Sequence, residues 1–139
     1  VYTGEGNAIK FFNVKDGLGI NLLIAGGIPV VILTAQISTI VRKRAADLDI
    51  PDVFYGLPKE KALPDILKKY DVSPEDVCYI GDDVIDIATA RQVGFSVAVA
   101  DAVDDLKRVV DYVTPQIGGR GAVRHIVELI MKEKGIWAY

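Results

Sequence analysis

The sequence predicts an α/β fold in which a doubly wound parallel sheet lies between helices, with a small β-hairpin at the N-terminus. Short apolar runs recur along the 139-residue chain, and such runs are typical of strands buried on both faces of a parallel sheet. Between them lie segments whose apolar residues recur at helical spacing. Strand–helix alternation of this kind indicates a doubly wound sheet.

Composition and charge restrict the classes of function. Half of the residues are hydrophobic and a quarter are charged, which is typical of a globular chain that buries a core. The chain carries 16 basic and 19 acidic residues without a basic cluster. Nucleic acid is therefore not expected as its main partner.

The compartment and the domain organisation follow from what the sequence contains. It has no apolar run long enough to cross a membrane and no recognisable signal peptide. Its single cysteine cannot form an internal disulfide, which fits a reducing compartment. We expect a cytoplasmic protein with no membrane partner. Because linkers, repeats and low-complexity stretches are absent, we expect one domain over residues 1–139.

The first residues predict the hairpin. Residues 4–7 (GEGN) have the composition of a turn, and residues 8–14 alternate weakly between apolar and polar side chains, as a strand does. The first arm is then only Val1 and Tyr2. Because an isolated hairpin is marginally stable in water, we expect this one to pack on the domain or on another subunit.

Five apolar runs are expected to form the strands of the sheet. The longer ones are rich in β-branched residues, which favour strands, and the shorter ones are weaker signals. In chain order they are residues 28–33 (IPVVIL), 53–55 (VFY), 77–80 (VCYI), 95–99 (FSVAV) and 112–113 (YV).

Four other segments carry an apolar stripe at helical spacing. The first precedes a Gly-Gly pair at 26–27, the third contains Pro64 near its start, and the last is the most clearly amphipathic. The stripes are formed by Leu18, Leu22 and Leu23; by Ile37, Ile40, Val41, Ala45 and Leu48; by Leu63, Ile66 and Leu67; and by Val123, Ile126, Val127 and Ile130.

Polar residues follow three of the expected strands, at the point where each strand ends. In open α/β sheets, ligands bind beyond the carboxyl ends of the strands. We therefore expect these side chains to converge at one edge of the sheet. They are Thr34 after the first strand, Lys59 or Lys61 after the second, and Asp82, Asp83 and Asp86 after the third.

Together these residue types predict a magnesium-dependent phosphate site. A threonine at a helix start offers its hydroxyl and nearby backbone N–H groups to a phosphate oxygen. A lysine adds a mobile positive charge, and clustered carboxylates suit Mg²⁺, which prefers oxygen ligands. Taken singly, a threonine or an aspartate here is explained as a helix cap and a lysine as a solvated side chain. Their joint placement, in this order, favours the phosphate site.

Other reactive or aromatic residues receive simpler interpretations. Cys78 lies inside an apolar run and is expected to be a small core residue. His125, the only histidine, has no partner among the site residues and is expected to be non-catalytic. Trp137 and Tyr139 form an aromatic tail that is expected to pack on the domain or on a neighbouring subunit.

An ordered set of motifs resembles a known family. The motifs are FNVKDGLGI at 12–20, ILT at 32–34, GDDVID at 81–86, VAVADA at 97–102, DYVT at 111–114 and GGRGAVR at 118–124. In this order they resemble the haloacid dehalogenase (HAD) superfamily of phosphatases, and more narrowly the capless 3-deoxy-D-manno-octulosonate 8-phosphate phosphatase family. The resemblance implies a Rossmann-like, doubly wound α/β fold of the HAD type.

The resemblance also implies roles at the phosphate. Thr34 matches the residue whose hydroxyl holds the transferring phosphoryl group, and Asp82 matches the ligand of the Mg²⁺ cofactor. Lys59 matches the motif lysine by its spacing to Gly81, with Lys61 as the alternative because the local match needs a one-residue gap. Asp83 and Asp86 match residues that orient the metal site.

For the substrate, the resemblance implies a phosphorylated sugar acid used in lipopolysaccharide precursor synthesis. It also implies a homotetramer in which the hairpin and the C-terminal tail help to close neighbouring active sites. The loop that contacts the sugar acid matches Asn13, Val14, Lys15, Asp16 and Gly17, and a basic substrate-contacting position matches Arg44.

The chain departs from the family pattern at positions that matter for the substrate and for catalysis. Ala35 and Gln36 stand where the family has Gly-Arg, and Asn21 stands where a basic residue is common, so bidentate partners for a carboxylate or phosphate are missing. The choice among octulosonate, nonulosonate and other sugar-acid phosphates therefore stays open. The family's Asp-x-Asp-Gly motif, which supplies the nucleophilic and acid/base aspartates from the central strand, does not occur in these 139 residues.

Two interpretations follow. In the first, the chain belongs to a working phosphatase whose nucleophile motif lies outside these residues, so the chain alone is expected to be inactive. In the second, it is a non-catalytic, oligomeric relative that binds a sugar phosphate. The retained threonine, lysine and acidic residues favour the first, whereas the missing Asp-x-Asp-Gly motif favours the second. A flavodoxin-like or receiver domain would share the sheet architecture but would not explain the GGRGAVR segment.

Overall fold

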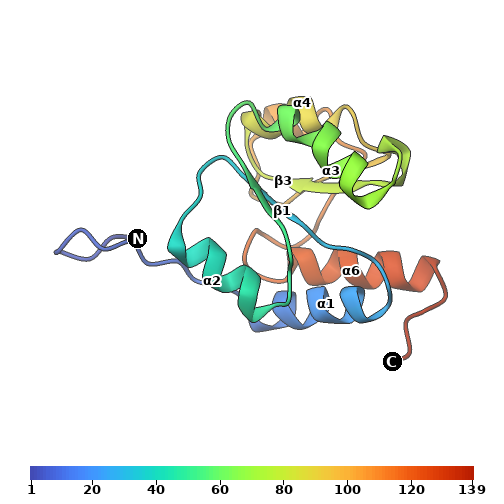
Figure 1. Cartoon of the computed structure of the whole chain (residues 1–139), viewed down its shortest axis with the longest axis horizontal. Coiled ribbons are helices and arrows are strands. Elements are labelled where there is room, and N and C mark those ends of the chain that lie inside the picture. Colours follow the sequence, from blue (N-terminus) through green and yellow to red (C-terminus); the bar gives the residue numbers. More distant parts are fainter.

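A computed structural model describes residues 1–139 (Figure 1). Two long helices, α1 (Val14–Ala25) and α6 (Ala122–Glu133), lie side by side on one side of the strands. Helix α2 (Thr39–Asp47) lies on this same side, whereas α3 (Leu63–Tyr70) and α4 (Ile87–Ala90) lie on the opposite side. The chain is therefore layered as the α/β prediction requires.

All the strands pair in parallel, but they form two sheets rather than one. Strand β1 (Ile32–Thr34) pairs with β2 (Val53–Tyr55). Strand β4 (Phe95–Ala98) lies between β3 (Cys78–Gly81) and β5 (Tyr112–Val113). No backbone pairing joins β1 to β3. The parallel arrangement confirms the predicted class, and the single continuous sheet is corrected to two.

Burial differs between the strand that is paired on both edges and those that are not. Val97 and Ala98 of β4 are completely buried. Every residue of β1 and β3 is only partly buried, although the sequence of each is that of an interior strand. Strands β1 and β3 each keep one edge without a partner strand, and unpaired edges of this kind are sites for further strand pairing.

The strand boundaries differ from the expected ones mainly at β1. Residues 28–31 precede the strand as irregular chain, so the six-residue apolar run contributes only its end to the sheet. Its early residues are used for packing instead, because Ile28 and Val30 contact the clusters under α1 and α6. The two weakest strand predictions, 53–55 and 112–113, match β2 and β5.

The hairpin is smaller than predicted. Its two arms are joined by one antiparallel bridge, between Tyr2 and Ala8, beyond a turn at residues 4–6. Residues 9–13 do not continue the strand, and Val14 begins α1 because the Asn13 side chain accepts the Asp16 N–H as an N-cap. The hairpin extends away from the rest of the chain (Figure 1). Its predicted packing on the domain is therefore not observed.

The four predicted helices are present, and short helical elements connect them to the strands. Ser38 caps α2, and α1 ends at the glycine pair 26–27, where Gly27 has a φ of +84°. The short elements are the 3₁₀ helices η1 (Lys59–Ala62), η2 (Pro74–Asp76) and η3 (Val84–Asp86), together with α4 and α5 (Asp104–Lys107). None of the helices is long and apolar enough to span a bilayer.

The core is divided into clusters that follow the layers. One joins β4 to α4, α5 and the start of α6, including Ala98, Leu106 and Ala122. A second joins α1 to α6 through Leu23 and Val127, and Trp137 of the C-terminal tail packs against it. The tail prediction is confirmed in part, because Trp137 packs on the domain.

Helices α1 and α6 are also joined by a buried carboxylate. Asp16 is 8% exposed, and its oxygens accept hydrogen bonds from the backbone N–H groups of Gly121 (3.2 Å) and Arg124 (2.9 Å). These donors belong to the N-terminal end of α6, where N–H groups lack partners within the helix and a negative charge is stabilising. Asp16 therefore acts as a helix cap supplied by a distant part of the chain.

Candidate active site

The residues predicted to bind phosphate lie around η1, which follows β2. Element η1 contacts β1, β2 and η3, so it connects the carboxyl ends of the two sheets. The central contact is an ion pair between Lys59 at the start of η1 and Asp86 at the end of η3, with 2.6 Å between Nζ and Oδ1. The two residues are 27 positions apart in the sequence.

This contact distinguishes the two lysine candidates. The Lys59 side chain is 11% exposed and that of Asp86 is completely buried. Lys61 is exposed and forms no ion pair. The structure therefore brings Lys59, and not Lys61, to the acidic motif.

Asp86 accepts hydrogen bonds on both carboxylate oxygens. Oδ1 accepts from Lys59 Nζ and from the Tyr79 hydroxyl, each at 2.6 Å. Oδ2 accepts from the backbone N–H groups of Asp82 (2.8 Å) and Asp83 (3.0 Å). Burial raises the pKa of Asp86, but the bonds from Lys59, Tyr79 and the backbone outweigh it and hold that pKa below its ordinary value.

The glycine before the acidic residues is required by this packing. A Cβ atom on Gly81 would lie 2.7 Å from the Asp86 carboxyl group, closer than real Cβ contacts allow. Without a side chain at this position, the Asp86 carboxylate can approach the backbone of the strand end and accept its N–H groups. Local packing thus explains the glycine of the Gly-Asp-Asp segment, in addition to the metal-binding role predicted for the segment.

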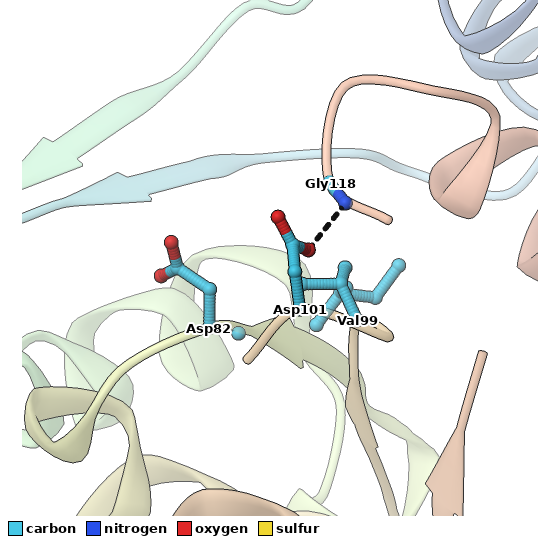
Figure 2. Close-up of a pocket in the computed structure, with 6 residues that line it drawn as sticks. Asp82, Val99, Asp101 and Gly118 are labelled. Carbon is cyan, nitrogen blue, oxygen red and sulfur yellow. Dashed lines mark hydrogen bonds between the residues drawn. The ribbon is translucent and has the colours of Figure 1, made fainter. Parts of the chain in front are cut away.

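Asp82 lies beside this pair and faces a pocket (Figure 2). The pocket has a volume of about 320 Å³ and is lined by Ile80, Gly81, Asp82, Val99, Asp101 and Gly118. Burial and, secondly, the negative charge of Asp86 raise the pKa of Asp82. Asp82 takes part in no ion pair within the chain. A cation bound in the pocket would offset both effects and lower the pKa of Asp82.

The chain supplies only part of a metal site. No group of three or more His, Cys, Asp or Glu side chains is arranged to hold a metal ion. Within the acidic motif, both oxygens of Asp86 already accept hydrogen bonds from the chain. Asp83 accepts the Val84 N–H at 2.7 Å as the cap of η3. Asp82 remains as a carboxylate that fits a hard cation such as Mg²⁺, which binds through one or two carboxylates and otherwise keeps water or phosphate ligands.

Thr34 lies at the end of β1, and its hydroxyl closes a local turn. It donates to the carbonyl oxygen of Gln36 at 3.1 Å, and the Gln36 N–H approaches it at 3.4 Å. Thr34 is partly buried, whereas Gln36 is exposed. The hydroxyl is thus held at the carboxyl end of β1, near η1.

The predicted substrate-contacting residues form a different cluster, at the start of α1. Arg44 of α2 donates from Nη2 to the Asn13 carbonyl oxygen at 3.4 Å, and its guanidinium lies 5.0 Å from the centre of the Phe12 ring. A Cβ on the buried Gly17 would lie 2.6 Å from Arg44 Nη2. Val14 and Lys15 are exposed beside them.

No hydrogen bond or ion pair links this cluster to Lys59, Asp82 or Asp86. The structure therefore divides the predicted site residues into two groups. Within the α1 group, Asp16 is committed to capping α6.

Two features of the site were not anticipated from the sequence. Tyr79 belongs to a predicted apolar strand, and nothing in the run VCYI indicates that its hydroxyl meets Asp86. Asp101 follows β4 and accepts the Gly118 N–H at 2.7 Å, and its carboxylate rises on the same side as that of Asp82 (Figure 2). An acidic residue shortly after a strand is a signal that could have indicated Asp101.

Known proteins resemble the chain in sequence and in fold. The family described as haloacid dehalogenase-like hydrolase matches residues 23–126. The 3-deoxy-D-manno-octulosonate 8-phosphate phosphatase of Haemophilus influenzae is 43% identical over 135 residues, which cover 96% of this chain and 75% of that protein. The Escherichia coli K12 enzyme of the same description is 42% identical, covering 97% and 73%.

Solved structures agree with the sequence matches. The Moraxella catarrhalis 3-deoxy-D-manno-octulosonate 8-phosphate phosphatase, in complex with magnesium, phosphate and KDO, has a TM-score of 0.90 and 38% identity, covering 95% of this chain and 76% of that one. The cobalt-bound enzyme from H. influenzae has a TM-score of 0.91 and 42% identity, covering 96% and 79%. These likenesses extend over nearly the whole chain.

Proposed function

Because the chain belongs to the haloacid dehalogenase-like hydrolases, and within them to the 3-deoxy-D-manno-octulosonate 8-phosphate phosphatase family, we propose that it forms the phosphate-holding part of a magnesium-dependent phosphatase acting on a sugar-acid phosphate. The observation that carries the proposal is the buried Lys59–Asp86 pair beside the pocket of Asp82. A buried ion pair is expensive to desolvate, so its presence at a strand-end pocket favours a functional role.

Each residue has a role in this proposal. Asp82 would hold Mg²⁺, which when bound neutralises charge on a transferring phosphoryl group. Lys59 would donate from its ammonium group to a phosphate oxygen, and the Thr34 hydroxyl would donate to another. Asp83 and Asp86 would keep the 82–86 segment in place through their backbone bonds. The sugar acid would be contacted by Asn13, Val14, Lys15, Asp16, Gly17 and Arg44.

The nucleophile belongs to the proposal as well. We infer that a strand carrying Asp-x-Asp-Gly pairs between β1 and β3. Both strands have an unpaired edge, both are only partly buried, and the Lys59–Asp86 pair connects the segments that follow β2 and β3. A parallel strand there would bring its last residues to the pocket of Asp82. Without it, the 139 residues offer no carboxylate positioned for in-line attack.

The biological setting is proposed from the same membership. The reaction would supply a precursor of lipopolysaccharide in the cytoplasm. A homotetramer would cover the apolar side chains that the N-terminal arm leaves exposed, among them Tyr2 (76%) and Phe11 (81%).

Two preparations test the function. The 139-residue chain alone should release no phosphate from 3-deoxy-D-manno-octulosonate 8-phosphate with Mg²⁺, whereas a chimera that adds an Asp-x-Asp-Gly strand before Val1 should release it. Asp82→Ala in the chimera should abolish release. A folded chimera that binds the substrate without turnover would overturn the phosphatase in favour of a sugar-phosphate-binding protein.

The lysine assignment has its own matched control. Tungstate, a phosphate mimic, should bind the chain in the presence of Mg²⁺, and calorimetry should find its affinity reduced by Lys59→Ala and unchanged by Lys61→Ala. Lys61 is the suitable control because it lies in the same element but is exposed. The reverse result would move the phosphate contact to Lys61.

A further inference from the structure

Tyr79 contributes a hydroxyl that packing alone does not explain. Its ring packs against the cluster around β4, where a phenylalanine would serve equally well. The hydroxyl instead donates to Asp86 Oδ1 at 2.6 Å. Burial, and secondly the bond to Asp86, raise the pKa of Tyr79 well above its ordinary value, so the hydroxyl keeps its proton and remains a donor.

The hydroxyl shares its acceptor with the lysine ammonium. Lys59 Nζ and Tyr79 Oη both approach the same oxygen of Asp86, while the other oxygen is held by the backbone N–H groups of Asp82 and Asp83. With four donors in place, the carboxylate cannot rotate, and Lys59 cannot move from Oδ1 to Oδ2 without displacing a backbone bond. The position of the ammonium therefore depends on how Oδ1 is shared.

We propose that Tyr79 is a positioning residue of the phosphate site, where its hydroxyl occupies part of Asp86 Oδ1 and leaves the Lys59 ammonium free to donate to a bound phosphate. This inference rests on the proposed function. If the hydroxyl is removed, Lys59 becomes the only side-chain donor to Oδ1. The Asp86 carboxylate then binds the ammonium more tightly, because Oδ1 no longer accepts a second hydrogen bond from a side chain. A tightly held ammonium donates less well to an anion.

The molecule offers a matched control for Tyr79→Phe. Tyr112 lies on β5 of the same sheet, is partly buried, and forms a hydrogen bond through its hydroxyl with His125 Nε2 at 2.9 Å. Tyr112→Phe removes an equivalent phenolic hydroxyl on the other side of β4. A purely structural role for Tyr79 predicts that the two variants behave alike.

Two measurements on the full chain test the inference. The first is the affinity for tungstate with Mg²⁺, by calorimetry. We expect Tyr79→Phe to weaken binding roughly tenfold, which corresponds to about 1.4 kcal/mol. Tyr112→Phe should leave the affinity unchanged. The second is the rate of acetylation of Lys59 relative to the exposed Lys61, by a pulse of acetic anhydride and mass spectrometry without ligand.

Acetylation of Lys59 relative to Lys61 should slow several-fold in Tyr79→Phe and stay unchanged in Tyr112→Phe. An unchanged ratio, or a changed ratio with unchanged tungstate affinity, overturns the positioning role. If the wild-type chain binds no tungstate, the proposed phosphate site is overturned. In that event the acetylation ratio still reports whether the hydroxyl controls Lys59.

Discussion

Two buried aspartates hold distant parts of this chain together, and they do so in different ways. Asp86 is completely buried and accepts four hydrogen bonds, one of them from a lysine. Asp16 is nearly as buried, but its two partners are backbone N–H groups of α6. Both were predicted as site residues. The difference teaches what each contact supports: Asp86 shares its carboxylate with a lysine beside a pocket, as the proposed phosphate site requires, whereas the bonds to Asp16 come from backbone groups alone, as in a helix cap.

Removing Asp86 should have the largest effect. Asp86→Ala leaves the Lys59 charge and two backbone N–H groups without their partner, and breaking a buried pair in this way costs about 3–5 kcal/mol of the free energy of unfolding. Urea denaturation measures it. The matched control is Asp83→Ala, which removes only the exposed cap of η3 and should cost about 1 kcal/mol. Similar losses in the two variants would contradict the special position of Asp86.

The pH dependence has a definite sign. The folded-state pKa of Asp86 lies below the unfolded value, so its stabilisation is present above the ordinary carboxyl pKa of about 4 and is lost as the pH falls through the lower folded value. Below pH 4, therefore, wild-type stability should fall more steeply than that of Asp86→Ala. If the stabilities of the two proteins fall in parallel below pH 4, the pKa of Asp86 does not differ between the folded and unfolded states.

Alanine substitution of the glycine near each aspartate should distinguish the two regions further. Gly81→Ala places a Cβ 2.7 Å from the Asp86 carboxyl group, which four bonds hold in place, and should cost about 1–3 kcal/mol as overpacking does. Gly17→Ala meets the ends of two side chains, Arg44 Nη2 at 2.6 Å and Leu48 Cδ2 at 3.2 Å, which can move, and it gains helix propensity. We expect it to be nearly neutral in thermal unfolding. A larger loss for Gly17→Ala would reverse the ranking of the two sites.

Removing the Asp16 carboxylate should lower the stability of the fold but leave the affinity for an anion unchanged. Asp16→Ala removes the cap of α6 and should cost about 1 kcal/mol. Its affinity for tungstate with Mg²⁺ should equal that of the wild type, because no contact links Asp16 to Lys59 or Asp82. A loss of affinity for tungstate without loss of stability would contradict this separation of Asp16 from the anion site.

A small effect of the opposite sign is expected at Asp82. Its pKa is raised, so the ionised carboxylate destabilises the folded state at neutral pH, and the penalty disappears as the pH falls and the group is protonated. Asp82→Asn should therefore raise the midpoint of thermal unfolding slightly at pH 7 without Mg²⁺, with the difference narrowing in acid. Added Mg²⁺ should stabilise the wild type but not the variant. Equal stabilisation of both would exclude Asp82 as the ligand.

Much of the fold and part of the site could be predicted from local patterns. Apolar runs and helical stripes located all the strands and long helices, and an element as short as β5 was found from two residues. The four-residue helices α4 and α5 were missed because they are too short to show a period. Strand-end positions indicated Asp82 and the two alternative lysines, Lys59 and Lys61, since polar residues after buried strands stand out in sequence.

By itself, the sequence determined the order of the elements, their parallel class and the family, because these depend on periodicity and on the spacing of motifs along the chain. Only the tertiary structure decided that Lys59 rather than Lys61 meets Asp86, that Tyr79 shares the same oxygen, that Asp16 caps a helix 105 residues away, and that the sheet divides between β1 and β3. The physical reason is that burial and pairing are set by neighbours in space, and no local pattern records which distant group reaches a buried carboxylate.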